Sequence, residues 1–239
     1  MTDTNFERSP LKEQNSVLKN LTYLIDLALY ITVMFLIREI YFSNFNFITN
    51  GLFWSLSTLI TATIILKFRK TRWRDIGLSL PTSYRQAAIA TVFIIGFSIA
   101  SIIVFEIAKD NMALGLSADQ SNANASAKFG ELNNNWLLFF SIIPFIWLQS
   151  ALEEILDRGF LINWIERALS CTWFATVSAV LIQAMLFGFR HSYDISERSI
   201  SVALIGLAMG IGYVAFGRNL WPLIIAHCVM NTLSMLERV

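Results

Sequence analysis

The sequence has few charged residues and few of the residue types that build metal clusters or disulfide frameworks. Only 15% of its 239 residues are Asp, Glu, Lys or Arg, against about 25% in an ordinary soluble domain. Its 2 cysteines, Cys171 and Cys228, are not spaced as a Cys-x-x-Cys pair. These shortages exclude a disulfide-stapled mini-protein and leave too little polar surface for most soluble enzymes. The formal net charge of +1 indicates no nucleic-acid partner.

Apolar residues dominate the chain instead. They make up 55% of it, and the mean hydropathy is +0.56, which excludes a disordered chain. A bilayer-crossing helix needs about 20 apolar residues, so the chain has room for roughly six to eight spans. We therefore expect an all-α polytopic membrane protein of about seven transmembrane helices. Residues 1–20 would be a polar N-terminus, and 21–239 would be a single membrane domain.

Seven apolar runs predict the spans. Pro144 interrupts the fourth run, and the polar stretch 109–135 is expected to be a loop. The expected ranges are 21–42, 51–66, 87–108, 136–165, 172–189, 200–216 and 220–236.

Basic residues predict the orientation in the membrane. Five of the eight residues at 67–74 are Lys or Arg, and such short basic loops mark the cytoplasmic side. We therefore expect residues 1–20 in the cytoplasm, followed by a first helix retained as an anchor, and the C-terminus outside. The compactness of the chain favours a prokaryotic protein of the cytoplasmic (inner) membrane.

The segment 153–158, with the sequence EEILDR, is the one dense group of charges inside an apolar run. Charges at membrane depth are costly and rare, so they indicate function. On a helix, Glu154 and Arg158 can form an i,i+4 ion pair, whereas Glu153 points about 100° away from Glu154. A carboxylate left without that partner can act as a general base. The alternative is a loop at the membrane surface that carries all four charges.

The 2 histidines of the chain both lie at or within apolar runs. His191 follows Phe187 by four residues, and Asn231 follows His227 by four, so each pair shares a helix face. Either histidine alone can be a packing residue bonded to a backbone carbonyl. Their occurrence together with the glutamate pair favours one cavity formed by the fourth, fifth and seventh spans. Gln149 and Gln183 can also face this cavity and bind substrate backbone.

These residues form three motifs that resemble the signatures of a known membrane-protein family. The family is CPBP, the CAAX proteases and bacteriocin-processing enzymes (also called ABI), with its Rce1-like members, and the similarity covers about 148–235. The resemblance implies that the first motif contains a structural ion pair, Glu154–Arg158. The motifs are Glu153-Glu154-x-x-x-Arg158, Phe187-x-x-x-His191 and His227-x-x-x-Asn231.

The resemblance also implies catalytic roles. Glu153 would be the general base that activates a water, and His191 would orient or share that water. His227 and Asn231 would stabilise the oxyanion of the tetrahedral intermediate. The implied enzyme is a glutamate-dependent intramembrane endopeptidase that cleaves a membrane-associated or lipidated peptide or protein.

A zinc ion is the one cofactor that these residues suggest. Glu153, His191 and His227 could supply three ligands and an open position for water, as in a metalloprotease. However, the chain has no His-Glu-x-x-His helix, so the use of a metal is left open.

Asp157 departs from the family pattern, which usually has an aromatic or other apolar residue just before the motif arginine. It could compete for Arg158 or face Glu153, and either contact would leave a retuned or weakened enzyme. The alternative function is therefore a non-catalytic membrane scaffold or a bacteriocin-immunity protein on the same fold. The sequence does not predict the substrate or the oligomeric state.

Overall fold

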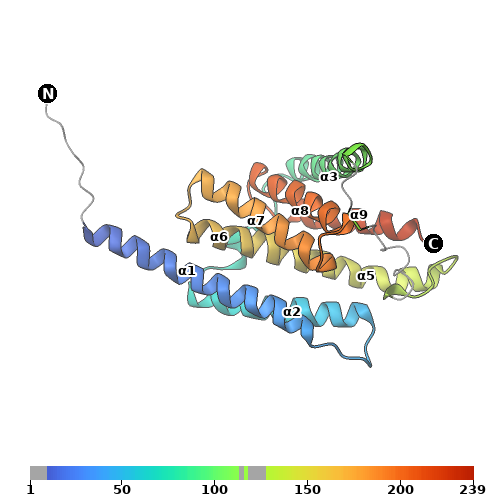
Figure 1. Ribbon diagram of the computed structural model, residues 1–239, viewed down its shortest axis with the longest axis horizontal. Helices are drawn as coiled ribbons and strands as arrows, with labels where there is room; N and C mark the ends of the chain where they lie inside the picture. The colour runs from blue at the N-terminus through green and yellow to red at the C-terminus, as the bar shows by residue number, and fades with distance from the viewer. Residues whose placement is uncertain (1–9, 113–115, 118–127) are drawn as a thin grey trace.

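The computed structural model describes residues 10–112, 116–117 and 128–239, and these form helices joined by short connections (Figure 1). An isolated bridge between Ser117 and Ser196 is the only strand-like pairing in this described part. The elements are α1 (Pro10–Leu36), η1 (Ile37–Glu39), α2 (Phe47–Phe68), η2 (Trp73–Ile76), α3 (Tyr84–Met112), α5 (Trp136–Glu153), η3 (Glu154–Ile162), α6 (Asn163–Ala168), α7 (Trp173–Ser192), α8 (Glu197–Ala215) and α9 (Trp221–Leu236).

Six helical segments are long and apolar enough to cross a membrane, which confirms the predicted polytopic helical fold. A seventh apolar helix, α9, is shorter than the others. Many large apolar side chains on these helices are exposed, for example Val92 on α3 and Phe140 on α5, as expected of surfaces that face lipid. The six segments are Leu18–Glu39, Phe47–Phe68, Tyr84–Asn111, Trp136–Ala168, Trp173–Ser192 and Glu197–Ala215.

Some ends differ from the sequence-based ranges. Helix α1 begins at Pro10, inside the polar segment 1–20, and helical structure ends at Glu39, before the predicted end at residue 42. Pro144 lies inside α5 without ending it, because neighbouring helices compensate for a proline in a membrane helix. Much of the expected loop 109–135 lies outside the described residues, and α3 extends into its start.

Helices α1 and α2 lie along one side of the bundle and α3 lies on the other, with α7, α8 and α9 between them (Figure 1). Small residues allow α7 and α8 to approach closely. A Cβ atom on Gly188 would lie 2.3 Å from the Ser199 carbonyl oxygen, and one on Gly206 would lie 3.0 Å from the Phe187 ring. Such close backbone contacts are typical of helix pairs in membranes.

Several basic residues lie near one another at one end of the bundle. Arg69 forms an ion pair with Asp26 at 2.7 Å, and Arg167 donates to Thr71 Oγ1 at 3.2 Å. Arg218 forms two 2.7 Å hydrogen bonds with Glu166, which raise the pKa of Arg218 above its usual range. This clustering agrees with the expected cytoplasmic end, and the orientation itself stays a prediction.

Candidate active site

The helix that carries the first motif changes its winding at the motif. Helix α5 ends at Glu153, and a π-helix, η3, runs from Glu154 to Ile162. π-Helical turns are rare and occur frequently at functional sites. Gly159 lies within η3, and a Cβ atom there would approach Leu220 Cδ1 to 3.0 Å. The glycine therefore lets the widened turn pack against the start of α9.

The charges of η3 are buried rather than exposed in a surface loop. Glu154, Asp157 and Arg158 are all 0% exposed. Arg158 Nη1 donates to Glu154 Oε1 at 3.0 Å, so the predicted i,i+4 pair forms. Arg158 Nη2 also donates to the Gly206 carbonyl at 3.4 Å, and the guanidinium lies 4.3 Å from the centre of the Phe187 ring. These contacts compensate for the burial of the charge.

Glu154 also holds His227. The same atom, Glu154 Oε1, accepts a hydrogen bond from His227 Nδ1 at 2.7 Å. Because Nδ1 is engaged by Glu154, only Nε2 of His227 can contact a substrate or a water. This Nε2 faces the carboxylate of Glu153. His227 Nε2 lies 3.8 Å from Glu153 Oε2. Glu154 is thus a structural carboxylate that aims His227 at Glu153.

Glu153 is the more accessible of the two glutamates. Its side chain is 18% exposed, whereas that of Glu154 is 0% exposed. Glu153 Oε1 accepts a hydrogen bond from Gln149 Nε2 at 3.1 Å. Its other oxygen, at 3.8 Å from His227 Nε2, is too far away for a direct hydrogen bond. A water beside the pair can therefore contact both the carboxylate and the imidazole.

Asn231 lies one turn beyond His227, on the face of α9 that meets α5. Asn231 Nδ2 donates to Ser150 Oγ at 2.9 Å, and Ser150 Oγ donates to the Ile146 carbonyl at 2.8 Å. The pairs Glu154–His227 and Ser150–Asn231 join the two helices at successive turns. The shared face expected for His227 and Asn231 is therefore present.

His191 is connected to His227 through the side chain of Phe187, which lies between them. Its Nδ1 atom lies 2.7 Å from the Phe187 carbonyl oxygen and donates to it, which leaves Nε2 as the acceptor. The Phe187 ring packs 4.6 Å from the His191 ring and 6.3 Å from the His227 ring, measured between centroids. Glu153 and His191 also interact electrostatically. All six predicted site residues thus belong to one connected region.

Comparison with known proteins agrees with this geometry. Residues 134–233 match the family model described as type II CAAX prenyl endopeptidase Rce1-like. This region is Rce1-like. It runs from just before α5 into α9 and contains all three motifs, so the family inferred from the motifs is confirmed. No curated protein and no solved structure matches the chain.

Part of the site comes from outside the Rce1-like region. Gln149 Nε2, which donates to Glu153, also contacts Ser55 Oγ of α2 at 2.8 Å. Sequence analysis placed Gln149 near the cavity but did not predict this bond, because no local pattern links residues 94 positions apart. Gln183 is 0% exposed within the bundle.

The departure at Asp157 has a partner that the sequence analysis did not foresee. Asp157 Oδ2 forms a 2.6 Å ion pair with Arg190 Nη2, from the last turn of α7. Neither expected contact, with Arg158 or with Glu153, is the one that forms. The Glu154–Arg158 pair of the Rce1-like region is therefore intact, with Asp157 held on another side of η3.

The surroundings of Glu153, His191 and His227 bear on the possible zinc ion. Among the described residues, no three His, Cys, Asp or Glu side chains come together at metal-ligand spacing. His191 contributes its Nδ1 to a backbone carbonyl, and His227 contributes its Nδ1 to Glu154. Both bonds leave the Nε2 atoms unengaged, and metal-ligating histidines usually have their other nitrogen bonded in this way, so the use of a metal by Glu153, His191 and His227 stays an open prediction.

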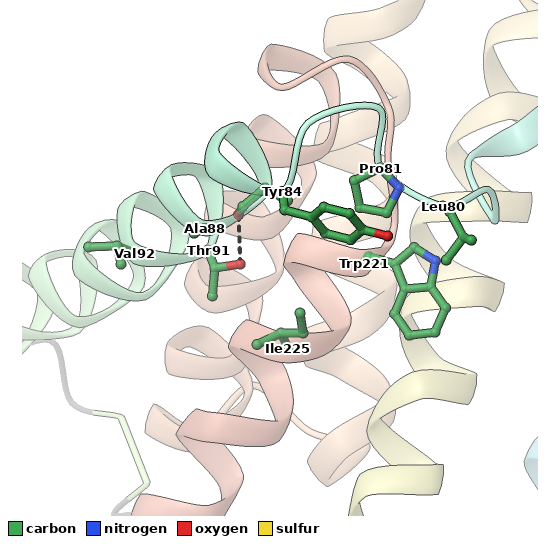
Figure 2. Close-up of a pocket in the computed structure, with 9 residues that line it drawn as sticks. Leu80, Pro81, Tyr84, Ala88, Thr91, Val92, Trp221 and Ile225 are labelled. Atoms are coloured by element: carbon green, nitrogen blue, oxygen red, sulfur yellow. Dashed lines mark hydrogen bonds between the residues drawn. The ribbon is translucent and has the colours of Figure 1, made fainter.

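An apolar groove of about 400 Å³ lies away from these residues, between the starts of α3 and α9. Figure 2 shows Tyr84, Trp221 and Ile225 around it. Thr91 Oγ1 is bonded to the Ala87 carbonyl at 2.9 Å, so this hydroxyl already has a partner. Ile225 and His227 are two positions apart and point to nearly opposite sides of α9. The groove is thus separate from the Rce1-like site.

Proposed function

We propose that this protein is a glutamate-dependent intramembrane peptidase of the CAAX-protease type. The observation that carries the proposal is the pairing of Glu153 Oε2 with His227 Nε2 across 3.8 Å. One member of the pair is held by Gln149 and the other by the buried Glu154. A base and an imidazole fixed in this way can position a water without a nucleophilic serine or cysteine.

The first chemical step is attack by that water. Glu153 takes one proton from the water while the water oxygen forms a bond with the carbonyl carbon of the peptide. The carbonyl π electrons move to the oxygen, which becomes the oxyanion. His191, whose Nε2 is an acceptor because Nδ1 donates to the Phe187 carbonyl, accepts the second hydrogen of the water and so orients it.

The oxyanion needs donors that are already in place. The Asn231 amide group has two N–H donors, and its bond to Ser150 uses one of them. His227 supplies a second donor when its Nε2 carries a proton, because its Nδ1 is already bonded to the Glu154 carboxylate. Both donors belong to the face of α9 that meets α5.

The second step breaks the peptide bond. The oxyanion collapses to a carbonyl, the C–N bond breaks, and Glu153 returns its proton to the leaving nitrogen. Glu153 is then a carboxylate again, and the products are a new carboxyl terminus and a new amino terminus. Every proton in this cycle is taken up and returned by Glu153.

The substrate that we propose is a membrane-embedded or membrane-associated peptide or protein, lipidated or not. Glu153 lies near the middle of the long apolar segment Trp136–Ala168, so a substrate has to approach within the bilayer. We further propose that the membrane is the cytoplasmic membrane of a prokaryote. The pairing of Asp157 with Arg190 leaves the Glu154–Arg158 pair intact, which supports the enzyme over the non-catalytic scaffold.

The test compares cells that lack the native gene and carry either the wild type or Glu153→Gln at equal expression. New peptide termini in the membrane fraction are mapped by mass spectrometry. Peptide termini that appear with the wild type and not with Glu153→Gln would support the peptidase proposal. Glu166→Gln is a matched control, because it changes a buried glutamate of the Arg218 pair outside the proposed chemistry. Identical termini in all strains, with the deletion phenotype rescued by Glu153→Gln, would favour the scaffold.

A further inference from the structure

The buried Asp157–Arg190 ion pair joins two elements that carry different parts of the proposed site. Asp157 belongs to η3, the π-helix of the Glu154–Arg158 pair. Arg190 belongs to the last turn of α7 and directly precedes His191. The side chains meet at 2.6 Å, with Asp157 0% and Arg190 12% exposed. The contact therefore ties the turn of His191 to the helix of the first motif.

A second contact holds the same turn. The backbone carbonyl of Arg190 accepts a hydrogen bond from Arg38 Nη1 at 3.2 Å. Arg38 itself lies between two aromatic rings, 4.8 Å from the centre of Trp54 and 4.9 Å from that of Tyr193. The last carbonyls of a helix lack partners within it, so this bond stabilises a turn that otherwise frays. His191 is thus presented by a helix end that is fixed on two sides.

The pair also balances charge. Three carboxylates, Glu153, Glu154 and Asp157, occur within five residues. Arg158 is paired with Glu154, so Arg190 supplies the positive charge that Asp157 contacts. Without Arg190, the buried negative charge of Asp157 would lie close to Glu153, the proposed base, and disfavour the ionised form of Glu153.

We infer that Asp157 and Arg190 are positioning residues that clamp the end of α7 against η3 and thereby hold His191 in place for reaction at Glu153. The inference rests on the proposed function for its catalytic consequence. The positioning of His191 can be measured without any activity, so a failure of the clamp and a failure of the peptidase proposal are distinguishable.

The first measurement is chemical labelling of the two histidines with diethyl pyrocarbonate. The full-length protein is labelled in detergent micelles, and modification of His191 and His227 is quantified on separate peptides. We expect Asp157→Asn and Arg190→Gln to speed His191 labelling several-fold and to leave His227 labelling unchanged. Arg190→Lys keeps a cation and should restore part of the protection. Labelling of His191 at the wild-type rate in both disruptive variants would overturn the inference.

A double variant separates positioning from simple charge balance. Asp157→Leu/Arg190→Leu removes both charges, and apolar replacement of a buried pair often preserves stability. We expect its melting temperature to return towards that of the wild type while His191 labelling stays fast. If labelling also returns to the wild-type rate, the pair only balances charge and the clamp is refuted. Glu166→Gln is the control, because it breaks a different ion pair and should leave His191 labelling unchanged.

The catalytic consequence is measured with a fluorescence-quenched prenylated peptide that ends in a CAAX sequence. Misplacement of a catalytic group by about 1 Å can reduce the rate about 100-fold. We expect kcat of Asp157→Asn to fall by about that factor with KM little changed. If Asp157→Asn has the kcat of the wild type although its His191 is labelled fast, the position of His191 does not matter for the reaction, and the catalytic part of the inference is wrong. An inactive wild type would count against the peptidase proposal or this substrate and leave the labelling result standing.

Discussion

The hydrogen bond from His227 Nδ1 to Glu154 Oε1 is 2.7 Å long and connects the first and third motifs directly. The two neighbouring glutamates therefore have different surroundings. Glu154 is fully buried between Arg158 and His227, whereas Glu153 keeps some exposure and faces His227 Nε2. Helix α5 ends at Glu153 and the π-helix begins at Glu154, so the change in winding coincides with the change in surroundings.

Glu154→Gln should destabilise the fold more than any surface substitution. The change leaves the buried Arg158 without a counter-charge and weakens the anchor of His227. Breaking a buried pair of this kind costs about 3–5 kcal/mol. The measurement is equilibrium unfolding in detergent, with Asp75→Asn as the control because its ion pair with Arg72 is exposed and contributes little. An unchanged midpoint for Glu154→Gln would contradict the anchoring role.

Gln149→Ala should slow the reaction while the protein stays folded. The change removes the hydrogen bond to Glu153 and its link to Ser55, so the base loses one of its two orienting contacts. We expect kcat to fall by about 10-fold or more, as for other supporting contacts. The matched control is Ser55→Ala, which keeps the bond to Glu153 and should have a smaller effect. Equal losses in both variants would mean that the link to α2, rather than the bond to Glu153, is what matters.

Asn231→Ala should affect the transition state rather than substrate binding. Loss of one oxyanion donor reduces kcat by about 10²–10³-fold, with KM nearly constant. Steady-state kinetics on the prenylated peptide separates the two parameters. Ser150→Ala removes the partner of Asn231 but keeps the donor, so it should retain most of the rate. A rise in KM alone for Asn231→Ala would instead assign Asn231 to substrate binding.

Gly188→Ala should loosen the packing of α7 on α8. The new Cβ would lie 2.3 Å from the Ser199 carbonyl oxygen and 2.6 Å from Ala203 Cβ, so one helix has to move. Overpacking of this kind costs about 1–3 kcal/mol. Gly96→Ala is the control, because a Cβ there meets nothing within 4 Å and alanine favours a helix. A melting temperature that falls only for Gly188→Ala would support the close α7–α8 contact.

The sequence by itself determined the class of the molecule and the identity of its candidate site residues. Apolar runs of membrane length have few alternatives to a helix, because lipid offers the backbone no hydrogen-bond partners. The Glu154–Arg158 pair was also predictable, since it depends only on residues one turn apart. The ends of α9 were close, at Trp221–Leu236 against the expected 220–236, whereas α1 begins at Pro10 rather than at residue 21.

Tertiary structure alone decided which of those residues contact one another. The bonds from Glu154 to His227, from Asp157 to Arg190 and from Gln149 to Ser55 join residues 73, 33 and 94 positions apart. No periodicity in the sequence specifies such contacts, because they depend on how separate helices pack and on where η3 widens. The same packing directs Asp157 to Arg190 and keeps it from the two partners that its sequence position suggested.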